Sequence, residues 1–278
     1  MSSPAFQLTY REVHGRVKLL AAFLQNTLAV KRGDAVAVYA DQSSSWLVVS
    51  LAIQAIGALE FPRHNNAVEA DLGKLTQATA CRVFFFSDVH IWQRVAAILK
   101  KRKAEVLLME TSASAKGSAA GVRSLGEIFR GEYAQAREFT VQSFPYAAVI
   151  STSGTTGDTK LVPVAQRAFL HAMRVVPRAL NLRARDSFLS CLPSWHLYAR
   201  LVEYVALGAG ARIVYSSIPD LAQTLRTSGA TVFPSFPVIW EQIYHRILYG
   251  LEPSPLRAVV QWGNGVVMRC ARIFAQWF

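Results

Sequence analysis

Short apolar runs alternate with longer helix-like segments along the first half of this chain, and this alternation limits the possible folds more than any other feature. The run Ala35–Tyr39 follows a turn at residues 31–34 and has the compact form of a buried strand. Residues 9–29 carry apolar residues at helical spacing, and Thr9 with Glu12 predicts a capping box. Such alternation is typical of an α/β fold with a mainly parallel sheet flanked by helices.

The same pattern continues to residue 151. Further strands are predicted at residues 58–61 (closed by Pro62), 82–86, 105–109 and 147–151, and further helices at 45–56, 69–79 and 89–99. Residues 111–121, of low complexity, are predicted to form a loop.

Composition excludes several classes of protein. With 278 residues, of which 52% are hydrophobic, the chain is too apolar for a disordered tail and long enough for a sizeable core. Its best apolar stretch, residues 46–59, is shorter than the roughly 20 residues that a membrane span needs. No signal peptide is visible, which favours a cytoplasmic location. Three widely spaced cysteines predict neither disulfides nor a zinc site, and no metal-ligand cluster is seen.

The net charge of +12 is concentrated in the second part of the chain. Basic residues exceed acidic ones by 17 to 13 up to residue 158, a balance of +4, and by 13 to 5 from Lys160 onward, a balance of +8. This excess fits anionic partners such as a phosphorylated cofactor, an acidic carrier protein or lipid headgroups. Scattered solvated arginines are the alternative interpretation. No recognition motif for nucleic acid accompanies the charge, so nucleic acid is not expected as a partner.

The most informative segment is the polar, glycine-rich stretch at residues 151–160, which directly follows a predicted strand. Gly154 and Gly157 permit close approach of the backbone, so that successive amides can surround an anion. Hydroxyl groups and the charge of Lys160 add further donors for a polyphosphate. The spacing differs from that of a Walker A loop.

This segment resembles the phosphate loop T-S-G-T-T-G-x-P-K-G of the adenylate-forming acyl-activating enzymes. Residues 152–160 match it except at Thr159, where the family has proline, and Leu161 replaces the following glycine. Residues 192–204 (LPSWHLYARLVEY) are similar to the L-P-x-W-H-x-x-E-R…E-Y segment of the long-chain branch, and residues 236–244 (FPVIWEQIY) to its V-P-R-V-W-E-x-I-Y. The resemblance covers residues 8–275.

The resemblance implies a ligase that joins a long-chain fatty acid to a thiol through an acyl adenylate. It implies ATP and Mg²⁺ as cofactors, and coenzyme A or the phosphopantetheine of an acyl carrier protein as acceptor. It places seven residues around the phosphates: Thr152, Ser153, Gly154, Thr155, Thr156, Gly157 and Lys160. Mg²⁺ would lie near Thr156, bridging phosphate oxygens, and no protein ligand for a metal is otherwise indicated.

The resemblance also places Trp195 and His196 at the adenylate and acyl-carboxylate pocket, with His196 as the candidate catalytic residue. Structural roles for both remain the alternatives. Arg200 is a candidate to pair with a phosphate or with Glu203, and by itself it is expected to form a structural ion pair. Ala199 stands where the branch has glutamate, so the charge of Arg200 needs another partner.

Family members are about twice as long as this chain. The resemblance therefore implies the first part of a large N-terminal AMP-binding domain, with residues 1–145 as a leading α/β part and 146–278 as the phosphate-loop and acyl-pocket part. No Y-G-x-T-E or T-G-D segment is found, nor the C-terminal lid domain with its catalytic lysine. The chain is expected to be inactive alone, whether it is a truncation, a split gene needing a complementing C-terminal half, or a decayed copy.

Two other functions stay open from the residues alone. The first is a non-catalytic pseudoenzyme fragment that binds a carrier, a lipid surface or a partner protein through its arginine-rich face. The second is a basic nucleic-acid or membrane binder unrelated to the ligases. A peripheral membrane contact, the acyl chain length, the acceptor and the oligomeric state are not fixed by the sequence.

Overall fold

The computed structural model describes residues 7–65, 72–73, 75, 79–109, 122–131, 138–153 and 159–250 of the chain. By its contacts the chain divides into two units, Met1–Val232 and Phe233–Phe278. The first unit contains both sheets, and the second contains α9 (Pro237–Gly250). The division into residues 1–145 and 146–278 stays a prediction.

The main sheet has seven strands in the order β5-β4-β3-β1-β2-β6-β7. All neighbouring pairs are parallel except β6 and β7, which form an antiparallel hairpin. The strands are β1 (Ala35–Tyr39), β2 (Leu59–Arg63), β3 (Val83–Phe86), β4 (Glu105–Leu108), β5 (Val122–Ser124), β6 (Tyr146–Ser153) and β7 (Thr159–Ala165). A smaller parallel sheet pairs β8 (Ser187–Ser190) with β9 (Arg212–Tyr215).

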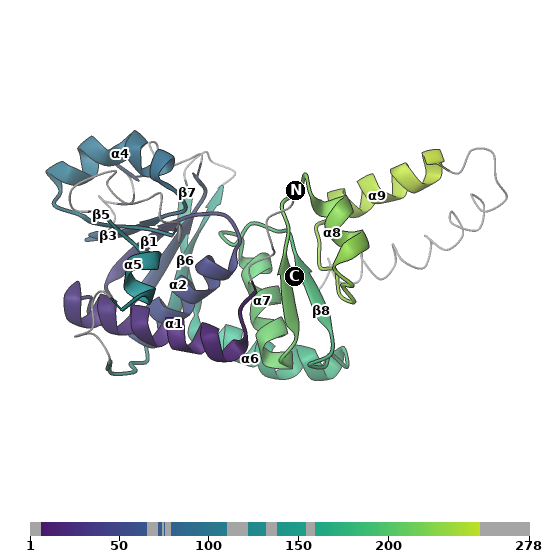
Figure 1. Ribbon diagram of the computed structural model, residues 1–278, viewed down its shortest axis with the longest axis horizontal. Helices are drawn as coiled ribbons and strands as arrows, with labels where there is room; N and C mark the ends of the chain where they lie inside the picture. Colours follow the sequence, from purple (N-terminus) through teal and green to yellow (C-terminus); the bar gives the residue numbers. More distant parts are fainter. Residues whose placement is uncertain are drawn as a thin grey trace. The chain divides into compact units, whose positions relative to one another are not determined.

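Helices cover both faces of the main sheet, with α4 on the opposite side from α1 and α2 (Figure 1). Their bounds are α1 (Tyr10–Ala22), the π-helix η1 (Phe23–Thr27), α2 (Ser44–Ala55), α4 (Val89–Lys101) and α5 (Leu125–Phe129). Helices α6 (Gln166–Ala179) and α7 (Leu197–Ala209) pack against each other and beside β6, and α8 (Leu221–Thr227) follows β9. The predicted α/β class with a mainly parallel, helix-flanked sheet is thus confirmed.

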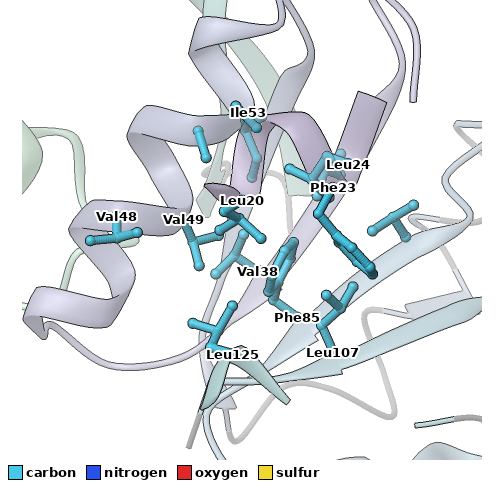
Figure 2. Packing of buried hydrophobic residues seen from close by; sticks show 14 of the residues in the cluster. Leu20, Phe23, Leu24, Val38, Val48, Val49, Ile53, Phe85, Leu107 and Leu125 are labelled. Atoms are coloured by element: carbon cyan, nitrogen blue, oxygen red, sulfur yellow. The ribbon is translucent and has the colours of Figure 1, made fainter. Parts of the chain in front are cut away.

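The hydrophobic core lies in a layer on each face of the sheet. On one face, Leu20 near the end of α1, Phe23 of η1 and Ile53 of α2 pack onto Val38 and Phe85 of the strands (Figure 2). On the other face, Trp92, Val95 and Leu99 of α4 meet Phe84 and Phe86. Because both faces are covered, the central strands read as continuous apolar runs rather than alternating ones.

Two sequence predictions need correction. Strand β2 does not stop before Pro62 but includes it, opposite Val38 of β1. Beyond Glu60 no residue of β2 pairs with β6, so the missing proline N–H breaks no ladder on that side. The first helix is not uniform, because its last turn is the π-helix η1 and Ala29 beyond it has a positive φ of 51°. The capping box of Thr9 and Glu12 is confirmed.

Most of the predicted helix at 69–79 and the loop at 111–121 lie outside the described residues. The other strands agree with prediction within about two residues at each end, as their bounds show.

Helices α6 and α7 cross at an unusually close distance that depends on Gly208. A Cβ built on Gly208 would lie 2.4 Å from the Met173 carbonyl oxygen. Pro177, four residues after Met173, has no N–H to donate to that carbonyl. The α7 backbone therefore packs directly against an α6 carbonyl.

We expect Gly208→Ala to lower the free energy of unfolding by about 1–3 kcal/mol, because the two helices must separate. Gly15→Ala in α1 is the matched control, since a Cβ there meets nothing within 4 Å. It should raise stability by about 0.5–1 kcal/mol. Urea denaturation followed by tryptophan fluorescence measures the stability of both variants. A change of the same sign in the two variants would contradict the close contact between α6 and α7.

Candidate functional site

The predicted phosphate-binding segment, residues 151–160, includes the end of β6 and the start of β7, which pair as an antiparallel hairpin. Backbone pairing places Thr152 opposite Lys160 and Ser153 opposite Thr159. The ladder thus brings Thr152, Ser153 and Lys160 together at the end of the hairpin, and the Lys160 side chain is exposed. Gly154, Thr155, Thr156 and Gly157 lie outside the described residues. An exposed ammonium at the end of such a hairpin is available to a bound anion.

Two histidines and a tryptophan meet beyond the carboxyl ends of the strands. The Trp195 ring lies 3.9 Å from the His196 ring and 5.0 Å, edge to face, from the ring of His64 (centroid distances). His64 directly follows β2, and Trp195 and His196 connect β8 to α7, with His196 as the N-cap residue of α7. Since Glu60 of β2 lies beside Ala148 of the parallel β6, His64 and the end of β6 at Ser153 occupy the same edge of the sheet. Ligands of open α/β sheets bind at that edge.

The surroundings of His196 favour the neutral form of its imidazole, and further hydrogen-bond donors lie nearby. Burial, together with the charge of His64, lowers the pKa of His196 below its ordinary value. The buried Nε1 of Trp195 and the buried Oγ of Ser194 have no hydrogen-bond partner in the described part of the chain. Buried donors normally have partners. These two therefore suit a ligand with acceptor oxygens, such as a carboxylate or a phosphate ester.

A buried ion pair fixes α7 to the main sheet. Arg200 donates to Glu60 through both terminal nitrogens, at 2.7 Å each, and to Ser50 Oγ at 2.9 Å. Arg200 and Glu60 are 1% and 0% exposed. Ser50 in turn donates to Glu60 at 2.6 Å, and Gln54 donates to Ser50 and to the Tyr204 hydroxyl. Arg200 is four residues from His196, so this network sets the position of the first turn of α7 and of the ring at its start.

Arg200 forms a structural ion pair, as expected, but its partner is Glu60 and not Glu203. The Arg200 side chain extends from α7 to the buried Glu60 of β2, and the two side chains meet at 2.7 Å. The Glu203 carboxyl accepts a hydrogen bond of 2.9 Å from Ser190 Oγ. Complete burial raises the pKa of Glu203 to about 7, against the opposing effects of Ser190 and Arg200.

Sequence reasoning missed His64 and Glu60. A usable indication existed for each. His64 follows a predicted strand directly, at the edge where ligands bind, and Glu60 is a charge inside an apolar run that must find a buried partner.

Among the described residues, no three His, Cys, Asp or Glu side chains come together as a metal site. No helix in the same residues is long and apolar enough to cross a membrane.

Comparison with known protein families gives a match over nearly the whole chain. The family described as AMP-binding enzyme matches residues 2–278. This range contains the hairpin, the Trp195–His196 pair and the Glu60–Arg200 ion pair.

Two curated proteins are similar to the chain. It is 28% identical over 268 residues to the long-chain-fatty-acid–[acyl-carrier-protein] ligase AEE15, chloroplastic, of Arabidopsis thaliana, covering 90% of this chain and 37% of that protein. It is 26% identical over 224 residues to the long-chain-fatty-acid–CoA ligase FadD15 of Mycobacterium tuberculosis, covering 79% of this chain and 37% of that protein. The chain therefore spans little more than a third of the length of these relatives.

Among solved structures, the fold is similar to the N-terminal subdomain of NpsA from Klebsiella oxytoca, a structure in complex with 3-hydroxybenzoyl-AMSN. The TM-score is 0.67 at 23% sequence identity, covering 88% of this chain and 57% of that one. At this identity the likeness concerns the fold.

Proposed function

The chain belongs to the AMP-binding enzyme family, and we propose that it acts in the ATP-dependent activation of a long-chain fatty acid for transfer to a thiol. The observation that carries this proposal is the hairpin turn, rich in glycine and hydroxyl groups, with Lys160 at its base. The names of the relatives, two long-chain fatty acid ligases, support the substrate class.

The proposed reaction has two steps. An oxygen of the fatty acid carboxylate attacks the α-phosphorus of ATP, the bond to the β-phosphate oxygen breaks, and pyrophosphate leaves with its electron pair. A thiol then attacks the acyl carbon, loses its proton, and displaces AMP to give a thioester. Charge on the phosphates dominates the first step, so binding groups act mainly by position and electrostatics.

In this proposal, Lys160 and the hydroxyls and amides of residues 152–157 bind the β- and γ-phosphates. Mg²⁺, when bound with ATP, would neutralise phosphate charge near Thr156. Trp195, Ser194 and His196 would orient the carboxylate. A neutral His196 can donate an N–H without adding a charge that competes with the phosphate site.

The acceptor is proposed to be coenzyme A or a carrier-protein phosphopantetheine. The name of the Arabidopsis relative gives an acyl carrier protein as acceptor, and the name of the Mycobacterium relative gives CoA. The two acceptors therefore have to be compared directly in an activity assay. We place the chain in the cytoplasm, with peripheral membrane contact as the open alternative, whereas the Arabidopsis relative is named as chloroplastic.

We further propose that these 278 residues bind the nucleotide but do not complete acyl transfer by themselves. The support is the length comparison, since the relatives' activity belongs to proteins matched over 37% of their length. Complementation by a separate polypeptide is one way in which activity would arise.

ATP–pyrophosphate exchange driven by palmitate tests this function. We expect no exchange by residues 1–278 alone, and exchange when they are combined with the C-terminal part of a family member. Under those conditions Lys160→Ala should reduce exchange at least tenfold, whereas Lys101→Ala, an exposed lysine at the end of α4, should not. Exchange by the 278 residues alone would contradict the proposal that they are not sufficient for activity. Equal exchange by both variants would contradict the assigned site.

A further inference from the structure

An open surface hollow of about 490 Å³ lies beside the contact of α6 with α7, along their C-terminal halves and within the first unit. Arg174 and Arg178 line it from α6, Arg183 from the segment after α6, and Gly208 from α7. The volume is within the range of small-molecule sites, roughly 300–1,000 Å³. It is formed by helix ends, whereas the hairpin turn and His196 occupy strand ends and the start of α7.

The hollow carries positive charge that the described protein does not neutralise. None of its lining residues is acidic. In the part of the chain that the structure describes, the Arg174 and Arg178 side chains make no ion pair, and Arg183 donates to the Asn181 side chain at 3.0 Å. The nearby Asp186 carboxyl accepts instead from the Arg183 backbone amide and from the Thr231 hydroxyl.

Helix capping does not account for these arginines. The last carbonyls of α7 receive backbone bonds from Gly210 and Ala211, and those of α6 from Leu180, Asn181 and Leu182. Each helix C-terminus carries about −0.5 charge, so two helices offset about one of the three positive charges. The Asp186 carboxylate also interacts electrostatically with Arg183, so the charges without an acidic partner in the described part of the chain are those of Arg174 and Arg178.

We propose that the α6–α7 hollow binds a phosphate group of a small molecule or a lipid headgroup, at a site separate from the hairpin turn. Guanidinium groups bind phosphate oxygens through paired N–H donors, and three arginines around one hollow can surround a dianion or a diphosphate. The asymmetry of the chain's charge supports the same ligand class, because +8 of the net +12 lies from Lys160 onward.

Calorimetric titration with inorganic pyrophosphate tests the hollow. Since the hairpin turn is itself proposed to bind polyphosphate, the titration uses the Lys160→Ala background. We expect Arg174→Ala and Arg178→Ala each to weaken the remaining binding at least tenfold. Arg178→Lys should weaken it less, and Arg167→Ala, an exposed arginine in the first turn of α6, should change it less than twofold. Circular dichroism checks the fold of each variant.

Vesicles separate the two sources of phosphate. If the chain sediments with phosphatidylglycerol vesicles but not with phosphatidylcholine vesicles, and pyrophosphate abolishes this sedimentation, the ligand of the hollow is a lipid headgroup. Pyrophosphate binding without sedimentation would assign it to a phosphorylated small molecule. Binding by neither probe, or an equal loss in Arg167→Ala, would overturn the proposal. Equal pyrophosphate binding by the wild type and by Lys160→Ala would instead contradict the function proposed for the hairpin and leave the proposal for the hollow standing.

Discussion

Glu60→Gln is expected to lower the free energy of unfolding by about 3–5 kcal/mol, the usual cost of leaving one partner of a buried ion pair without the other. The Arg200 guanidinium is 1% exposed and both of its terminal nitrogens donate to Glu60. A neutral amide offers one oxygen in place of two and no opposing charge. The guanidinium would remain buried with its charge uncompensated.

Guanidinium chloride denaturation measures this loss, with Glu138→Gln, the same change at an exposed carboxyl, as the control. The double variant Glu60→Leu with Arg200→Met should be more stable than the sum of the two single changes predicts, because it removes both charges together. A loss below 1 kcal/mol in Glu60→Gln would show that the ion pair does not hold α7 in place.

Glu203→Gln should change the pH dependence of stability. Burial raises the pKa of Glu203 from 4.5 to about 7 in the folded protein. Between these values the folded chain keeps a proton that the unfolded chain releases, so the stabilising contribution of this group is complete below pH 4.5 and is lost as pH rises through about 7. The loss is on the order of 3 kcal/mol.

The glutamine variant keeps an acceptor for Ser190 Oγ but cannot ionise. Its stability should therefore match the wild-type value near pH 5 and exceed it near pH 8. Urea denaturation across this pH range tests the expectation, and Glu138→Gln should follow the wild-type curve. Parallel curves for Glu203→Gln and wild type would show that the carboxyl does not titrate in this range.

The strands could be predicted because their residues carry the information locally. Runs such as the one from Ala35 to Tyr39 are apolar throughout, since helices cover both faces of the sheet. Pro62 could not be placed in the same way. Whether a proline fits inside β2 depends on which strand lies beside it, and that neighbour is some 85 residues further along the sequence.

The same distinction, between features that are local in the sequence and features that depend on the fold, applies to the candidate site. The hairpin turn stood out because its glycines, hydroxyls and lysine are contiguous. The pairing of Glu60 with Arg200 joins residues 140 positions apart, and no periodicity connects them. The sequence indicated that each buried charge needed a partner, but only the fold identified which one. The contact of His64 with Trp195 depends on the fold in the same way.

Calorimetric titration of ATP with Mg²⁺ into the 278-residue chain tests most directly whether the hairpin turn binds a nucleotide's phosphates. We expect saturable binding that Lys160→Ala weakens at least tenfold and that Arg178→Ala, in the separate α6–α7 hollow, leaves within twofold. Absence of ATP binding, or equal affinity in wild type and Lys160→Ala, would contradict it.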